Sequence, residues 1–266
     1  MHSRCLRLAP LLLCLAALPA TGRDLAEIKA QGTLRVLGVS PLPTDEFLSS
    51  LPQTDRPGFD YEILDGFASL QRVKLELIRL PGWDGLIPAL RAGRGDIVAG
   101  RFTVTDSRRE QVDFSSEVFP SRYVVLTRQP HKIIGSLEEL RAERVGTVKG
   151  TSLAEAVAAI GVPKANVDDV PSGHLPDALR DGRVAAVVIG VENAIAAQRV
   201  DPLLQMGLFV GPPRSLAYAV RKGDLQLLKA LNEYVENVRR TQTWGRLVVK
   251  YFGEAAPDIL KKSRAE

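Results

Sequence analysis

The sequence has 266 residues, of which 45% are hydrophobic and 25% are charged, a composition typical of one large globular domain or two small ones. Its formal net charge is +4; without residues 1–22, which hold two Arg and no acid, 33 basic residues face 31 acidic ones and the charge is +2. Such a mild balance does not indicate binding to nucleic acid or to an anionic membrane surface.

The first 22 residues have the pattern of a secretory signal peptide. Arg4 and Arg7 precede an apolar run over 11–20, and Ala20 and Gly22 supply small residues for cleavage. The alternative, an N-terminal membrane anchor, is disfavoured because the run is too short to span a bilayer comfortably. We therefore expect a periplasmic protein.

Both cysteines, Cys5 and Cys14, lie inside this segment, so the mature chain would have no disulfide and no cysteine-based metal site. Leu13 precedes Cys14 where a bacterial lipidation signal needs a small residue, so we do not expect a lipoprotein.

Strands and helices alternate through the mature chain, which favours an α/β architecture with parallel sheets. Ile63, Phe67 and Leu70 are expected to form the apolar face of one amphipathic helix. The elements expected up to residue 117 are helices over 24–31 and 61–71, strands over 34–39, 73–78 and 97–99, a loop over 40–57, and helices beginning near residues 84 and 106.

The second part of the chain continues the alternation. Ser152, with Glu155 three residues later, has the pattern of a capping box at a helix start. A Gly/Pro-rich stretch over 207–213 is expected to connect elements. The remaining expected elements are helices over 137–140, 175–180, 225–240 and 243–252, a helix after residue 190, and strands over 144–148, 184–189 and 216–220.

A polar cluster follows the strand over 97–99. Thr105 or Asp106 is a suitable N-cap, which places Arg108 in the first turn of the next helix. A cation is mildly unfavourable there, yet with neighbouring hydroxyl groups and free backbone N–H groups it would suit an anion such as a carboxylate. The alternative is a solvated surface Arg beside ordinary capping threonines.

Several motifs in order resemble the family 3 extracellular solute-binding proteins, the amino-acid receptors of ABC importers. They are G-F-D at 58–60, W-D-G-L-I-P-A-L at 83–90, T-V-T-D-S-R at 103–108 and Q-V-D-F-S at 111–115. The resemblance implies a periplasmic-binding-protein fold of class α/β, with two lobes and the ligand cleft between them. It assigns 23–117 and 219–266 to lobe 1, 123–213 to lobe 2, and 118–122 and 214–218 to the hinges.

The same resemblance proposes the ligand-binding residues. In the family, the Arg of T-x-T-x-x-R binds the ligand's α-carboxylate and the first Thr adds a hydrogen bond, which here are Arg108 and Thr103. An aromatic residue stacks on the ligand at the position of Trp83, and the second-lobe turn K-G-T-S closes on the carboxylate. The residues assigned on this basis, with the cleft positions around them, are Trp83, Arg101, Thr103, Arg108, Lys149, Thr151, Ser152, Gly190 and Glu192.

One position departs from the family pattern. An Asp that receives the ligand's α-ammonium is expected at residue 190, which is Gly here. An ammonium in a desolvated cleft without a counter-charge is unfavourable, and Arg101 and Lys149 add positive charge. We therefore expect an anion, or a ligand without a free α-ammonium, unless Glu192 supplies the missing carboxylate.

Other activities are weaker interpretations. The sequence has no metal-ligand spacing, Walker loop, G-x-S-x-G or G-x-G-x-x-G motif, so we expect no cofactor and no metal. Periplasmic cyclohexadienyl dehydratases resemble the same fold, and there Glu192 could act as a general acid. The N-terminal modules of membrane-bound lytic murein transglycosylases are also similar, as in P-G-F-D-Y-E at 57–62.

We expect a binding protein rather than an enzyme. Its partners would be a small carboxylate-bearing ligand, resembling an amino acid, and an inner-membrane ABC permease, with no nucleic acid, and it would act as a monomer through hinge closure. A free-standing sensor or regulator remains an alternative.

Overall fold

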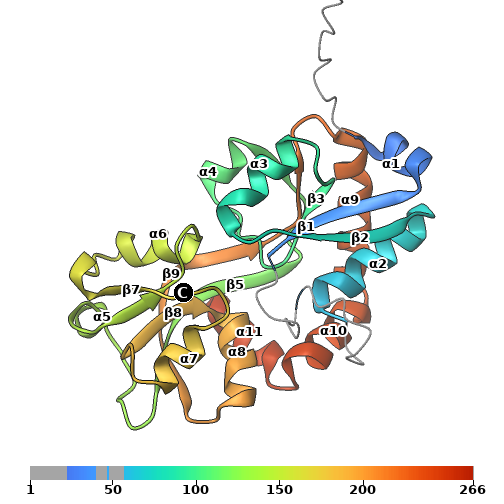
Figure 1. The fold of residues 1–266 in the computed structure, drawn as a ribbon. Helices are drawn as coiled ribbons and strands as arrows, with labels where there is room; N and C mark the ends of the chain where they lie inside the picture. The colour runs from blue at the N-terminus through green and yellow to red at the C-terminus, as the bar shows by residue number, and fades with distance from the viewer. Residues whose placement is uncertain (1–22, 40–46, 48–56, 266) are drawn as a thin grey trace, which may run out of the picture.

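The computed structural model describes residues 23–39, 47 and 57–265; the expected signal peptide and most of the expected loop over 40–57 lie outside these residues. Two five-stranded sheets form two lobes (Figure 1). The sequence predicted parallel sheets, but both sheets are mixed. In each, parallel strands are joined by antiparallel ones contributed from distant parts of the chain.

The first lobe is built on the sheet β2-β1-β3-β10-β4. β1 pairs in parallel with β2 and β3, whereas β10 is antiparallel to β3 and β4. The strands are β1 (Thr33–Gly38), β2 (Lys74–Arg79), β3 (Ile97–Val98), β4 (Val112–Phe114) and β10 (Ala219–Arg221), and the helices along this part of the chain are α1 (Leu25–Gln31), α2 (Phe59–Gln71), η1 (Trp83–Gly85), α3 (Leu86–Arg91), α4 (Asp106–Arg109) and α9 (Leu225–Arg240).

The second lobe is built on the sheet β7-β6-β8-β5-β9. β6 is parallel to β7 and β8, and β5 is antiparallel to β8 and β9. The strands are β5 (Phe119–Arg128), β6 (Val145–Thr147), β7 (Val167–Asp169), β8 (Ala186–Gly190) and β9 (Leu204–Leu216), and the helices are α5 (Leu137–Ala142), α6 (Ser152–Ala159), η2 (Lys164–Asn166), α7 (Leu175–Arg180) and α8 (Val191–Val200).

The two lobes are connected by β5 and β9. Their pairing begins at Phe119 opposite Leu216, beside the first lobe, and continues to Arg128 opposite Leu204 in the second. The stretch over 207–213, expected to be a connection, is therefore part of β9. Its prolines are tolerated because β9 is at the edge of its sheet, where a missing N–H breaks no ladder.

Two helices follow α9, although the sequence indicated only one. α10 (Gln242–Phe252) packs against α9 and α2, and α11 (Ala256–Arg264) packs against β5, α8 and β9. The end of the chain thus lies on the second lobe, within the range that the resemblance assigned to lobe 1.

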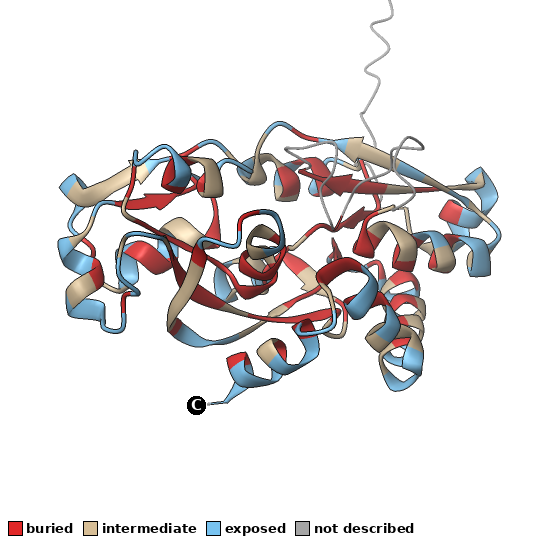
Figure 2. Cartoon of the chain, turned by 90° about the horizontal axis from the view of Figure 1, so that it is seen from below, coloured by how far each residue is buried: buried red, intermediate tan, exposed pale blue. Residues whose placement is uncertain are grey.

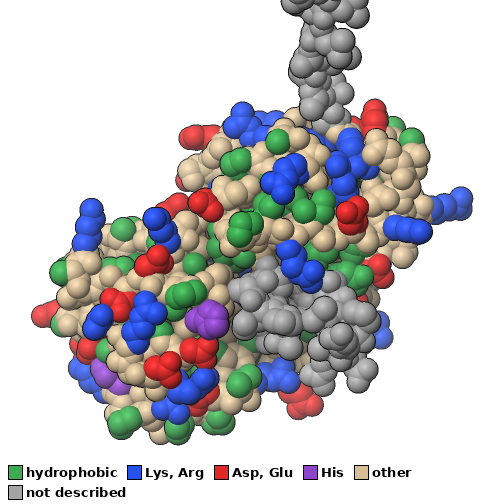
Figure 3. Space-filling model, viewed as in Figure 1, with side chains coloured by type: hydrophobic (Ala, Val, Ile, Leu, Met, Phe, Trp, Pro, Cys, Tyr) green, Lys and Arg blue, Asp and Glu red, His purple; other side chains and the backbone are tan. Residues whose placement is uncertain are grey.

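The core follows the sheets and the inward faces of the helices (Figure 2). On α2, Ile63 and Phe67 are buried as expected, but the expectation for Leu70 is wrong: it is 63% exposed. The buried face of α2 includes Phe59, whose ring contacts Phe119 edge-on at 5.3 Å between centroids. On the face in Figure 3, basic and acidic side chains are interspersed over both lobes.

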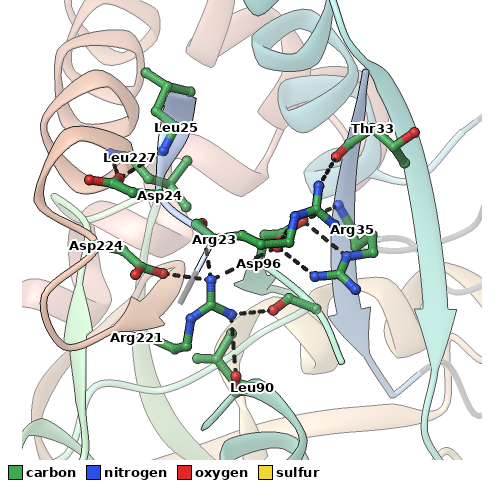
Figure 4. Close-up of polar contacts among 11 residues, drawn as sticks. Arg23, Asp24, Leu25, Thr33, Arg35, Leu90, Asp96, Arg221, Asp224 and Leu227 are labelled. Carbon is green, nitrogen blue, oxygen red and sulfur yellow. Dashed lines mark hydrogen bonds and ion pairs between the residues drawn. The ribbon is translucent and has the colours of Figure 1, made fainter. Parts of the chain in front are cut away.

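A cluster of buried ion pairs and hydrogen bonds connects residues 23–35 to the start of α9 (Figure 4). Asp96, which is fully buried, pairs with Arg35 at 3.0 Å, while Arg221 pairs with Asp224 at 2.7 Å and donates to the carbonyl of Gly95. Asp24 caps α1 by accepting from the N–H of Leu25 and also accepts from the N–H groups of Gln226 and Leu227 in the first turn of α9. One side chain therefore satisfies free donors at two helix starts.

Candidate functional site

The lobes are in contact across the cleft. The indole N–H of Trp83, in η1, donates to Ser172 Oγ of the second lobe at 3.3 Å, and Arg101 Nη1 donates to Asn193 Oδ1 on α8 at 2.9 Å. A Cβ added at Gly150 would lie 3.6 Å from the Cβ of Asp84. The structure is therefore a closed arrangement of the two lobes.

Between the lobes is a cavity of about 350 Å³. It contains eight of the nine residues that the sequence proposed: Trp83, Arg101, Thr103, Arg108, Thr151, Ser152, Gly190 and Glu192. Lys149 is not among the lining residues; it is exposed, and its backbone N–H donates to Asp169.

Arg108 is held from two sides. Thr105 is the N-cap of α4 and accepts from the backbone N–H of Arg108, whose side chain lines the cavity. Its Nη1 donates to the carbonyl of Thr103 at 2.7 Å, and its guanidinium carbon lies 4.2 Å from the centroid of the Phe102 ring. The other N–H donors of the fork have no protein acceptor among the described residues.

Burial lowers the pKa of the Arg108 guanidinium, although Glu155 opposes the shift. The charge has therefore lost part of its hydration and would gain from an anionic partner in the cavity. Arg109, the neighbouring residue, is exposed, does not line this cavity, and lies near the ring of Phe114.

The turn before α6 closes the cavity from the second lobe. The expected capping role of Ser152 is wrong: Thr151 is the N-cap, accepting from the N–H of Ala154, and Ser152 is the first helical residue. This frees the hydroxyl of Ser152 to accept from the phenol of Tyr123 at 2.6 Å. Burial raises the pKa of Tyr123, which therefore favours the neutral, donating phenol.

Glu192 is the acidic residue at the centre of the cleft. Only 3% of it is exposed, and its carboxylate accepts from Ser121 Oγ at 2.6 Å and from Asn193 Nδ2 at 3.2 Å. Burial raises its pKa, while Ser121 and the nearby Arg101 act in the opposite direction. A buried carboxylate of this kind is stabilised by a cation placed beside it.

The carboxylate of Glu192 occupies the space that a side chain at residue 190 would fill. A Cβ built on Gly190 would lie 2.0 Å from Glu192 Oε1 and 2.6 Å from its Cδ. Any other residue at 190 would displace this carboxylate, so Gly190 and Glu192 form one structural unit.

Arg101 bridges the two lobes through its bond to Asn193. Its guanidinium carbon lies 5.6 Å from the centroid of the Phe47 ring and 5.9 Å from that of Trp83, within the range of cation–π attraction. Its φ of 62°, in the turn after β3, is rare for a non-glycine residue. Asp60 stabilises that turn by accepting from the N–H of Gly100 at 3.0 Å.

Sequence reasoning missed the other lining residues, among them three polar ones that contact the proposed residues: Ser121, Tyr123 and Asn193. Ser121 and Tyr123 belong to β5, a strand in which nearly every residue is buried, and a run of this kind does not reveal which of its members will line a cavity. Asn193 follows Glu192 by one residue and could have been noticed only as its neighbour.

Two α/β lobes joined by paired strands, closed around a cavity with polar ends, define the periplasmic-binding-protein fold. The model of the bacterial extracellular solute-binding proteins, family 3, matches residues 46–254, so the chain belongs to this family.

The relatives are consistent with this assignment. A probable histidine-binding protein from Neisseria gonorrhoeae is 31% identical over 260 residues, which cover 94% of each chain. A membrane-bound lytic murein transglycosylase F from Desulfosudis oleivorans is 25% identical, but the match covers 73% of this chain and 44% of that protein. The chain thus shares one module with transglycosylases, and it shares nearly its whole length with a binding protein.

A crystal structure of a mutant of ArgBP from T. maritima superposes with a TM-score of 0.76 at 27% identity, covering 86% of this chain and 99% of that one. The expectation of a binding protein rather than an enzyme agrees with these matches. No helix in the described part of the chain is long and apolar enough to cross a membrane, and no group of His, Cys, Asp and Glu there could hold a metal ion.

Proposed function

We propose that this protein is exported to the periplasm, binds an α-amino acid there and delivers it to an ABC permease. The observation that carries the proposal is the pair of opposite charges in one closed cavity: Arg108 on the first lobe and Glu192 on the second. A zwitterionic ligand placed between them would contact both lobes and so favour the closed state by its differential affinity.

In this proposal Arg108 binds the ligand's α-carboxylate, with the hydroxyls of Thr103 and Ser152 nearby as further polar groups. Glu192 binds the α-ammonium. The position of its carboxylate, in the space left by Gly190, favours this arrangement over the ligand without an ammonium that the sequence indicated. The histidine-binding assignment of the Neisseria relative supports an amino acid as the ligand class.

Replacing Arg108 tests the proposal. Removing one partner of a buried charge pair costs about 2–5 kcal/mol, so Arg108→Ala should weaken binding of the best amino acid by roughly thirty-fold or more. A thermal-shift screen against the amino acids identifies that ligand, because a ligand that binds only the folded state raises its stability. Calorimetry then measures its affinity.

Arg109→Ala is the matched control, since Arg109 is exposed and does not line the cavity. It should leave the affinity unchanged. Equal affinity in wild type and Arg108→Ala would contradict the proposal.

A further inference from the structure

The cavity extends well beyond the charged pair. From the N-terminus of α8 it follows one face of that helix, lined by residues 193, 196, 197, 200 and 201, the spacing of a single helical stripe. At a rise of about 1.5 Å per residue, the nine steps from Glu192 to Asp201 correspond to roughly 13 Å along the axis. The cavity therefore continues far past Arg108 and Glu192.

The opposite wall of this extension is α7, which lies beside α8 in the second lobe (Figure 1). Between the charged ends the lining residues of the two helices are apolar: Leu175 and Pro176 on α7, and Ala196 and Ala197 on α8. The small alanine side chains leave room for an aliphatic chain between the two helices.

The far end is charged again, with both signs present. On α7, Arg180 Nη1 lies 2.8 Å from Asp177 Oδ1, and Asp201 follows the end of α8. A hydrogen bond from Arg128 lowers the pKa of Asp201, and Arg180 contributes in the same direction, so Asp201 is a carboxylate under ordinary conditions. Arg180 and Asp177 are each nearly half exposed, so their ion pair is weak enough for a ligand to replace it.

This arrangement repeats the chemistry of the inner site at the outer end. Resting on the proposed function, we propose that the groove between α7 and α8 is a second subsite, and that the preferred ligand is a diamino dicarboxylic acid. One amino-acid end would lie between Arg108 and Glu192 and the linking chain between the two helices. The second carboxylate would then bind Arg180, and the second ammonium Asp177 and Asp201.

A set of matched probes separates the effect of length from the effect of charge. Diaminopimelate carries both groups at its far end, 2-aminopimelate only the carboxylate, lysine only the ammonium, and norleucine neither. Cystine and homocystine extend the two-ended series to longer linkers. In calorimetry, the best two-ended probe should bind about tenfold or more tightly than each single-ended one, a difference of about 1.4 kcal/mol.

Variants locate the effect in the groove. Arg180→Ala should remove the advantage of the two-ended probes over lysine and leave norleucine binding unchanged, whereas Arg183→Ala, outside the cavity on the same lobe, should change neither. Ala197→Phe should fill the groove and weaken the two-ended probes selectively. Unchanged binding of alanine, whose methyl group does not reach the groove, shows that each variant is folded.

Two-ended probes that bind no more tightly than single-ended ones, or an advantage over lysine that survives Arg180→Ala, would overturn the subsite. That result leaves the inner site intact as long as amino acids bind and Arg108→Ala weakens them. If no α-amino acid binds at all, it is the proposed function that fails.

Discussion

Moving the buried carboxylate from residue 192 to residue 190 should preserve recognition of an ammonium, whereas removing it should not. A Cβ at Gly190 would lie 2.0 Å from Glu192 Oε1, so a carboxylate attached at 190 would begin in the same part of the cleft. Glu192→Gln is the removal, and Gly190→Asp combined with Glu192→Ala is the transfer.

The expected magnitude follows from burial. Glu192 is 3% exposed, so the ammonium that it contacts would be almost entirely desolvated. Losing one partner of such a pair costs about 2–5 kcal/mol, and Glu192→Gln should therefore weaken an amino acid by roughly thirty-fold or more. The double variant should recover most of this loss. Gly190→Asp alone should be worse than wild type, because two carboxylates would compete for one space.

Calorimetry with L-histidine and N-acetyl-L-histidine provides the assay, since acetylation removes the ammonium and keeps the carboxylate. Wild type should prefer the free amino acid, and Glu192→Gln should lose the preference. Glu139→Gln, at an exposed ion pair on α5, is the control. If the acetylated compound binds wild type as well as the free one does, the role given to Glu192 is refuted.

Three further results are expected. Burial raises the pKa of Glu192, and only its charged form would bind the ligand's ammonium. Amino-acid affinity should therefore be constant above this raised pKa and decrease as the pH is lowered, starting at a higher pH than the 4.5 of an ordinary glutamate would give. Calorimetry across pH 4–8 measures this affinity. Burial also raises the pKa of Asp224 from 3.8 to about 6, despite Arg221. Between pH 6 and 4 the folded state therefore binds a proton that the unfolded state does not, so the free energy of unfolding should increase as the pH falls through this range. Asp224→Asn should lack this increase. Finally, Phe59→Ala should cost about 3–5 kcal/mol in urea unfolding, because Phe59 is fully buried against other rings, whereas Leu70→Ala should stay within about 0.5 kcal/mol.

The elements that the sequence predicted well are those decided within a few residues. α1 lies between its N-cap Asp24 and its C-cap Gly32, whose φ of 70° suits glycine, and α9 has the predicted bounds. Thr105 caps α4 and orients Arg108 by a contact three residues away. Local capping and helical periodicity suffice for such features, because the interacting groups are neighbours in the chain.

The errors arose where a distant segment decided the outcome. Ser152 matched a capping box, but in the structure its hydroxyl accepts from Tyr123, on another strand. Leu70 continued an apolar stripe, yet no element in the described part of the chain covers it. The Gly/Pro stretch over 207–213 became a strand only because β5 offered it an edge to pair with.

The site shows the same division. The sequence by itself predicted eight of the residues that line the cleft, because motif order and the resemblance to the family carried that information. Only the tertiary structure decided that Glu192 turns back into the space beside Gly190, that Arg101 bonds to Asn193 across the cleft, and that the cavity continues along α8. The bond of Arg101 depends on the closure of two separately folded sheets, and the other two depend on how β5, α7 and α8 pack within the second lobe. No periodicity within one segment records such packing.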